Sequence, residues 1–156
     1  MTGMDIFNLI CTILSLLFSL ISICQAKKAK QYKEETLHLR DTFDLETLLC
    51  RFMIESKYFQ DNTRDKNWYK GQGADRINAI ISPFKQILSS FGSLYHLISI
   101  EHQADVKYKV DELNSIVNTY DRANEKDIKK TNKLILELTN ILQDEVHSNK
   151  AAVATN

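Results

Sequence analysis

The sequence predicts an all-α protein in which one N-terminal transmembrane helix continues into a cytoplasmic four-helix bundle. Three observations lead to this prediction. An uncharged apolar run occupies residues 6–26, apolar side chains recur at helical spacing in the rest of the chain, and no segment shows sustained strand-like alternation. The expected parts are a membrane helix with a short outside N-terminus over 1–26, a helical bundle over 27–148 and a frayed tail over 149–156.

The apolar run 6–26 has the length of a bilayer span. At 1.5 Å per residue it reaches about 31 Å, which is the thickness of the hydrocarbon layer. A secretory signal peptide would have basic residues before a shorter apolar core and a small-residue cleavage site after it. Here no Lys or Arg precedes the run, and QAKKAK ends and follows it. The sequence therefore favours a membrane anchor.

The charges beside the run predict its orientation. Asp5 lies on one side, and Lys27, Lys28 and Lys30 lie on the other, where they suit the membrane interface and its anionic headgroups. Because positive residues stay in the cytoplasm, we expect an outside N-terminus and a cytoplasmic C-terminal domain. The expected location is the inner (cytoplasmic) membrane, with a single pass through the lipid bilayer.

The polar residues of the run recur at alternating spacings of four and three residues. They are Asn8, Thr12, Ser15, Ser19 and Ser22. This heptad spacing puts them on one face of the helix, called here the polar stripe. The stripe could pack helices of a homo-oligomer together, or line a water-filled pore in such an oligomer. Alternatively, its hydroxyl groups bond back to carbonyls of their own helix and contact no partner.

Glycine and proline divide the remaining chain into helices. Nothing interrupts a helix from Met4 to about Gln60, and the segment 60–73 has the composition of a loop. A second helix is expected from Ala74 to Ile100. In both helices apolar residues recur at helical spacing on one face. In the first helix they are Leu45, Leu48, Leu49, Phe52, Met53 and Phe59. In the second they are Ile77, Ile80, Ile81, Phe84, Ile87, Leu88, Phe91, Tyr95 and Ile98.

Two further helices complete the expected bundle. Pro83 and Gly92 should kink or divide the second helix, and a third is expected over about 104–122. Asn124 has the character of an N-cap for a fourth helix, which ends near His147. The apolar positions are Val106, Val110, Leu113, Val117 and Tyr120 in the third, and Ile128, Leu134, Ile135, Leu138, Ile141 and Leu142 in the fourth.

The loop between the first two helices interleaves basic and aromatic residues. A ligand or RNA site could be formed by Arg64, Lys66, Trp68, Tyr69, Lys70 and Arg76, because cations bind phosphates and aromatic rings stack on bases. The alternative is that Trp68 and Tyr69 anchor the loop on the bundle, as buried aromatic residues do. The anchoring interpretation is favoured. Gly71 and Gly73 similarly favour a flexible turn over a phosphate site.

Other kinds of chemistry lack the residues they require. There is no phosphate-binding glycine-rich motif, and the four His and three Cys are scattered without ligand spacing, so we expect no catalytic residues, no metal and no cofactor. Only Asp5 among the 20 acidic residues precedes Lys27, and all 20 basic residues lie from Lys27 onward. The expected cytoplasmic part is thus nearly neutral, which argues against a strongly basic nucleic-acid-binding domain.

The plan of a short anchor carrying the stripe Asn8, Thr12, Ser15, Ser19 and Ser22, a basic boundary and a small helical domain resembles a known family. It is similar to the membrane accessory proteins of RNA-targeting CRISPR systems of the type VI-B branch. The resemblance implies a HEPN-like bundle behind a membrane helix. It also implies an oligomeric membrane pore in antiviral defence, with a CRISPR effector protein or RNA as a partner.

The sequence departs from catalytic HEPN domains at their active-site motif. Those domains have an Arg followed four to six residues later by a His, and no Arg of this chain has a His at that spacing. We therefore expect a protein that is not a ribonuclease or any other enzyme. The predicted function is a pore-forming membrane effector, and the alternative is a membrane-tethered helical module that binds a protein or RNA.

Overall fold

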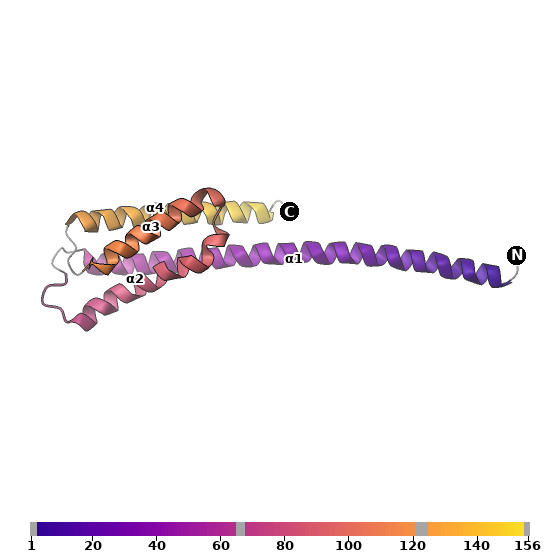
Figure 1. Ribbon diagram of the computed structural model, residues 1–156, viewed down its shortest axis with the longest axis horizontal. Helices are drawn as coiled ribbons and strands as arrows, with labels where there is room; N and C mark the ends of the chain where they lie inside the picture. The colour runs from indigo at the N-terminus through magenta and orange to yellow at the C-terminus, as the bar shows by residue number, and fades with distance from the viewer. Residues whose placement is uncertain (1–2, 65–67, 121–124, 155–156) are drawn as a thin grey trace. The chain divides into compact units, whose positions relative to one another are not determined.

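A computed structural model of the chain describes residues 3–64, 68–120 and 125–154. Within these residues it contains only helices and connecting turns (Figure 1). The elements in chain order are α1 (Gly3–Thr63), α2 (Ala74–Leu94), the 3-10 helix η1 (Tyr95–Leu97), α3 (Ile100–Asn118) and α4 (Glu125–Ala154). The expected all-α class with four α-helices, the first of them long and apolar at its N-terminal end, is confirmed.

The chain divides into two compact units, Met1–Leu39 and Arg40–Asn156. The first unit is formed by the N-terminal part of α1, in which every side chain that the structure describes is exposed except the half-buried Glu35. The second unit contains the rest of α1 together with α2, η1, α3 and α4. It also contains all the buried apolar side chains of the described residues. The hydrophobic core therefore belongs to the second unit alone.

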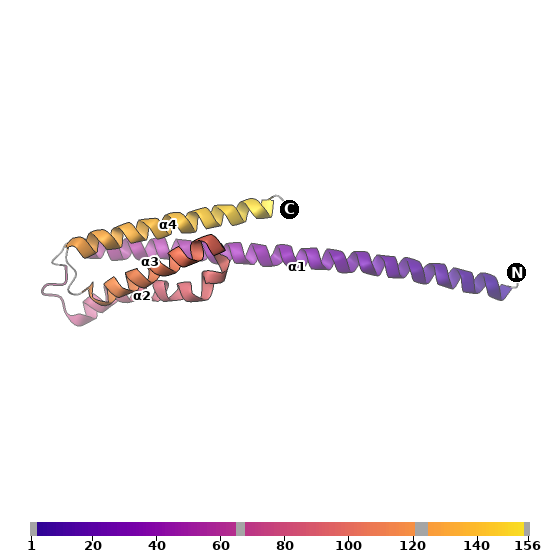
Figure 2. The ribbon, with the colours of Figure 1, turned by 45° about the horizontal axis from the view of Figure 1, so that its top comes forward.

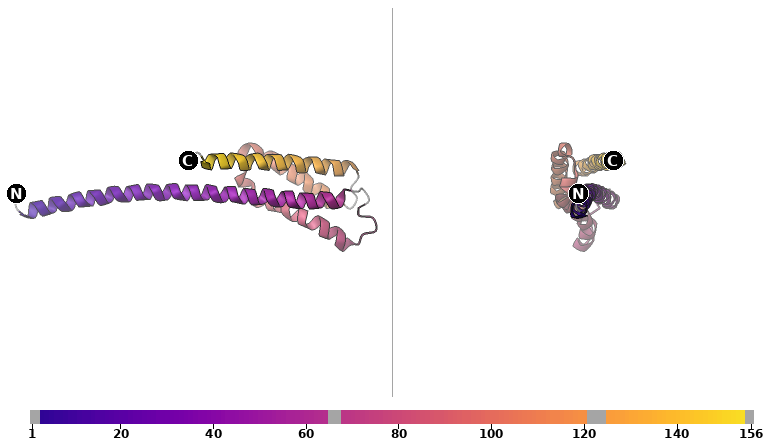
Figure 3. Two further views of the ribbon diagram at one scale, coloured as in Figure 1. Left: turned by 180° about the vertical axis from the view of Figure 1, so that it is seen from behind. Right: turned by 90° about the vertical axis from the view of Figure 1, so that its right-hand side faces the viewer.

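The four helices of the second unit are packed antiparallel to their neighbours (Figures 2 and 3). Glu46 of α1 pairs with Lys150 of α4, whereas Gln60 near the end of α1 bonds to Asn132 near the start of α4. These two contacts require α1 and α4 to run in opposite directions. Three pairs between α3 and α4 show the same arrangement: Lys109 with Glu137, Lys130 with Glu112, and His102 with Glu145.

Aromatic side chains fill the centre of this bundle. Phe59 of α1 stacks on Phe84 of α2 with ring centroids 4.6 Å apart, and its ring lies 4.7 Å from that of Tyr120. Phe52 makes an edge contact with Phe91 at 5.5 Å. Each of these five residues is at most 1 % exposed. Offset and edge-on aromatic pairs of this kind add to the stabilisation that burial alone provides.

The apolar periodicity of the sequence identifies most of the core correctly. The buried residues among those predicted are Leu45, Leu48, Phe52, Phe59, Ile80, Ile81, Phe84, Ile87, Leu88, Phe91, Ile98, Val106, Val110, Leu113, Val117, Tyr120, Leu134, Ile135, Leu138 and Leu142. Another five pack against them partly buried: Leu49, Ile77, Tyr95, Ile128 and Ile141. Met53 is the exception, because 44 % of its surface is exposed.

Several predicted helix boundaries were wrong. Residues 60–63, expected in a loop, form the last turn of α1, and α2 ends at Leu94 instead of Ile100. Both Pro83 and Gly92 lie inside α2, and the break comes just after them at η1 and Ser99. The third helix accordingly begins at Ile100 instead of about residue 104 and ends at Asn118, and residues 121–122 of the expected range lie outside the described residues.

The two ends of the fourth helix had separate outcomes. The predicted N-cap Asn124 lies outside the described residues. At the other end α4 continues to Ala154, so residues 149–154 are helical where a frayed tail was expected. Lys150 in this last stretch forms an ion pair with Glu46, and the neighbouring alanines have the highest helix propensity of any residue. These two effects account for the extension.

Candidate functional site

The N-terminal part of α1 is long and apolar enough to cross a membrane. None of its most apolar 18-residue window is buried, and large side chains such as Leu16 and Phe18 are 61 % and 67 % exposed. A core helix of a water-soluble protein has similar composition but is buried, which this segment is not. A signal sequence near an N-terminus also has such a composition. The described residues contain one helix of this kind.

The hydroxyl groups of the polar stripe bond to their own helix. Each donates to the carbonyl oxygen four residues earlier, at distances of 2.8–2.9 Å, as seen for Thr12, Ser15, Ser19 and Ser22. This back-bonding is the third interpretation of the stripe. It satisfies the hydroxyl donors within the helix, while each oxygen keeps a lone pair that can accept another hydrogen bond. All five stripe residues, Asn8 included, are exposed.

The predicted interface lysines follow directly on the apolar segment. Lys27, Lys28 and Lys30 are exposed on α1, and Lys30 lies 3.9 Å from Glu34 one turn later. Such an exposed pair contributes little to stability. The side chains are therefore available to anionic headgroups, and this role stays a prediction.

The basic and aromatic loop residues do not share one environment. Trp68 is only 6 % exposed and its ring lies 6.0 Å from that of Tyr120, whereas Tyr69 is half-buried. Exposed positions are occupied by Arg64, Lys70 and Arg76, and Lys66 lies outside the described residues. The burial of Trp68 fits the anchoring interpretation, because a buried ring offers no face to a base. Recognition of RNA by this loop stays a prediction.

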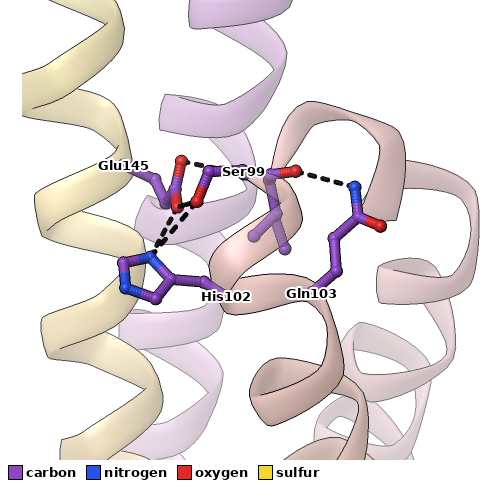
Figure 4. A network of polar contacts seen from close by, with 5 residues as sticks. Ser99, His102, Gln103 and Glu145 are labelled. Carbon is purple, nitrogen blue, oxygen red and sulfur yellow. Dashed lines mark hydrogen bonds and ion pairs between the residues drawn. The ribbon is translucent and has the colours of Figure 1, made fainter.

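A polar cluster that the sequence did not predict joins the start of α3 to α4 (Figure 4). The Glu145 carboxylate is 5 % exposed and accepts hydrogen bonds from the Ser99 hydroxyl and, at 3.1 Å, from the Ser99 backbone N–H. His102 Nδ1 lies 2.7 Å from the same carboxylate. Gln103 supports the turn by donating to the carbonyl of Ile98 at 2.9 Å.

The arrangement of this cluster suits a structural clamp better than a nucleophilic site. In a serine nucleophile site the imidazole lies between the hydroxyl and the carboxylate, so that it can take the hydroxyl proton. Here the Ser99 hydroxyl donates directly to Glu145, and His102 binds that carboxylate with the same nitrogen that faces Ser99 at 3.4 Å. The carboxylate thus holds the first residues of α3 against α4. Ser99 and His102 are three residues apart, but Glu145 lies 43 residues beyond His102, and no sequence spacing indicates that contact.

The two ionisable groups of the clamp stabilise each other's charged forms. Although burial acts against it, the hydrogen bonds from Ser99 and His102 lower the pKa of the Glu145 carboxyl below its ordinary value. The hydrogen bond to Glu145, with smaller contributions from Glu101 and Asp144, raises the pKa of His102 above 6.5. Between about pH 4.5 and 6.5 the Glu145 carboxylate and the His102 imidazole are therefore both charged.

The stability of the bundle should depend on pH through His102. A raised pKa in the folded state gives stabilisation that is complete below 6.5 and is lost as the pH rises through the folded value. We therefore expect His102→Gln to destabilise the protein more at pH 6 than at pH 8.5. Thermal unfolding of both proteins across this range would test it, and the variant His147→Gln is the control because the exposed His147 contacts the Gln143 carbonyl of its own helix. An equal loss at both pH values would contradict the assignment.

Metal ligation finds no support in the described residues. They contain no group of three or more His, Cys, Asp or Glu side chains arranged to hold a metal ion. The three cysteines, Cys11, Cys24 and Cys50, are free thiols on exposed positions. Cys50 lies on the part of α1 that belongs to the bundle.

The fold and these sites define an all-α protein with a compact antiparallel bundle and one helix able to cross a membrane by its length and composition. No protein-family model, curated protein or solved structure matches the chain.

Proposed function

We propose that the protein is a non-enzymatic, single-pass membrane effector whose copies associate in the bilayer and form a pore. Its N-terminus would lie outside the inner membrane and its bundle in the cytoplasm. The observation that carries the proposal is the exposed apolar part of α1, where Leu16, Phe18 and Leu20 are each at least 60 % exposed. A side chain of this size gains about 1.5–3 kcal/mol when it leaves water, so lipid is the environment that fits this segment.

The polar stripe supports association of the membrane helices. Small hydroxyl side chains let helices approach closely, and the lone pairs that back-bonding leaves unused can accept hydrogen bonds from a neighbouring helix or from water. When several copies turn the stripe inward, it presents polar oxygens to the centre while Leu, Ile and Phe face lipid. Such an arrangement would tolerate water along the axis of the assembly.

The biological setting proposed for this pore rests on the resemblance of the chain to the type VI-B accessory proteins. It would place the protein in antiviral defence, where a CRISPR effector protein or RNA engages the HEPN-like bundle. The absent Arg–His motif argues that the bundle does not cut RNA.

A second candidate function is a membrane-tethered module that captures a protein or RNA. One observation favours it: the stripe hydroxyls already have partners in their own helix, so the membrane helix does not require a second copy. In that case the membrane segment would be a plain anchor, and an unrelated single-pass anchor could replace it without loss of function.

Changing Ser15, Ser19 and Ser22 together to Leu should reduce leakage of a small dye from liposomes at least about tenfold, because apolar constrictions exclude water from a pore. The full-length protein would be reconstituted in liposomes, and dye release would be measured at equal protein density. The change to Ala at the same three positions keeps the small size that close packing needs, and so separates a wet lumen from helix packing.

A matched control removes bulk from the other side of the helix. Leu17 and Ile21 lie about half a turn from the stripe, and their change to Ala should leave leakage within about twofold. Unchanged leakage in the Leu variant, with oligomers intact, would exclude the pore. A monomeric mass for the detergent-solubilised protein would exclude the oligomer as well.

A further inference from the structure

One face of α1 within the bundle unit carries large apolar side chains that the described residues leave exposed. Phe43 is 66 % and Ile54 65 % exposed, and Thr47 and Cys50 between them are also exposed. These four residues, called here the outer face, are separated by four, three and four positions. They lie on the side of α1 opposite to Leu45, Leu48 and Phe52, which are buried in the core.

The outer face repeats the register of the polar stripe in the sequence. Asn8, Thr12, Ser15 and Ser19 correspond in order to Phe43, Thr47, Cys50 and Ile54, and each pair is 35 residues apart, which is five heptads. A straight α-helix drifts by about 20° per heptad from such a repeat, so the repeat forms one continuous seam only when helices supercoil around each other. Between the stripe and the outer face the same heptad positions are occupied by the cations Lys33 and Arg40. Like charges would repel there, so this middle part would contribute least to helix pairing.

From the exposed face and its register we propose that the outer face packs against the outer face of a second copy of this chain, with the two α1 helices parallel. The inference rests on the proposed membrane insertion. Copies that enter a membrane in one orientation have parallel helices and stand at the same height, so each residue meets its equivalent. Phe43, Cys50 and Ile54 are uncharged and apolar, and they can therefore face their own equivalents without repulsion.

The residues beside the seam are complementary in such a pair. In a parallel heptad arrangement the residue before a core position approaches the partner's residue five positions later. Glu46 and Arg51 occupy these positions and have opposite charges; the Glu46 carboxylate also pairs with Lys150 of its own chain, but its side chain stays 34 % exposed. Met53 and Tyr58 occupy the next pair and are both 44 % exposed. An antiparallel partner, or an unrelated acidic or basic surface, would not match the charged pair and the apolar pair at the same time. A second copy is thus the occupant that this surface fits.

Cross-linking through Cys50 tests the contact directly. In full-length protein in liposomes, with Cys11 and Cys24 changed to Ser, a short bis-maleimide should link most chains into dimers through their single thiol. Adding Ile54→Glu should reduce the linked fraction at least about tenfold, because two like charges would face each other across the seam. Since Ile54 is exposed in the single chain, that variant should keep the thermal stability of the bundle.

Control variants separate a specific contact from chance collisions. With Cys50 changed to Ser, a thiol placed by Tyr108→Cys on the exposed side of α3 should give little linked dimer, although Tyr108 is as exposed as Ile54. Leu136→Glu on α4 should leave the Cys50 link unchanged. Equal linking through position 108, or a Cys50 link insensitive to Ile54→Glu, would overturn the inference.

The mass of the detergent-solubilised particle distinguishes this inference from the proposed function. An oligomer that conducts dye but gives no Cys50 link would overturn the outer-face contact and leave the pore standing. A monomer without leakage would overturn both. An oligomer with the Cys50 link supports the contact whether or not the stripe conducts water.

Discussion

Changing Glu145 to Ala should destabilise the bundle by about 2–4 kcal/mol, since the side chain receives three polar contacts at a buried position. The variant leaves the Ser99 backbone N–H and hydroxyl without the carboxylate that they bind. Hydrogen bonds to a charged group are worth about 1.5–3 kcal/mol each, and a small cavity adds to the loss.

The measurement can use the only tryptophan of the chain, because Trp68 is buried in the same unit. Its fluorescence during urea unfolding reports the bundle directly. A domain of this size is stable by about 5–15 kcal/mol, so the expected loss is a large part of the total. Glu145→Gln keeps the volume and one acceptor and should cost less than Ala. The matched control is Glu137→Ala, which removes a half-buried carboxylate from the same helix.

The pH dependence of this effect follows from the lowered pKa of the Glu145 carboxyl. Its stabilisation is complete above about pH 4.5 and is lost as the pH falls through the lower folded value. The difference between wild type and Glu145→Ala should therefore shrink in acid. A difference that stays constant down to pH 2 would show that lost packing, and not the carboxylate, is responsible.

The helical fold could be predicted from the sequence because its signal is local and periodic. The positions of Phe84, Leu88 and Phe91, or of Val106, Val110 and Leu113, identify buried faces without any knowledge of the partner helix. Boundaries were less predictable, since they depend on contacts. The pairing of Lys150 with Glu46 extends α4, and the clamp on Ser99 fixes the start of α3. Both involve residues more than 40 positions apart.

The candidate sites were only partly predictable for the same reason. The stripe is visible in the sequence because five polar residues share one helix face. Back-bonding was one of three interpretations of it, and only the structure shows that these hydrogen bonds form. The outer face was hidden in another way. Phe43 and Ile54 read as ordinary apolar residues until the buried side of α1 is known, and only then is their exposure unusual.

Changing Trp68 to Ala should destabilise the protein by about 3–5 kcal/mol, the usual cost of truncating a buried aromatic side chain. The indole lies 6.0 Å from the ring of Tyr120 and 6.2 Å from that of Tyr69, so it joins the loop to the core. Thermal unfolding followed by far-UV circular dichroism is the measurement, because the variant has no tryptophan. Tyr108→Ala, which truncates an exposed aromatic residue, should change stability by less than about 0.5 kcal/mol.

Trp68→Phe separates anchoring from recognition more sharply than Ala does. The indole N–H is buried and has no hydrogen-bond partner among the described residues, so losing it removes a buried unsatisfied donor while an aromatic ring remains. We expect a loss of less than about 1.5 kcal/mol, well below that of Ala. If Trp68 instead stacked on a base, Ala would weaken RNA binding and leave stability nearly unchanged. In that case the exposed Arg64, Lys70 and Arg76 would bind the RNA phosphates. Their change to Gln should leave stability intact under either interpretation.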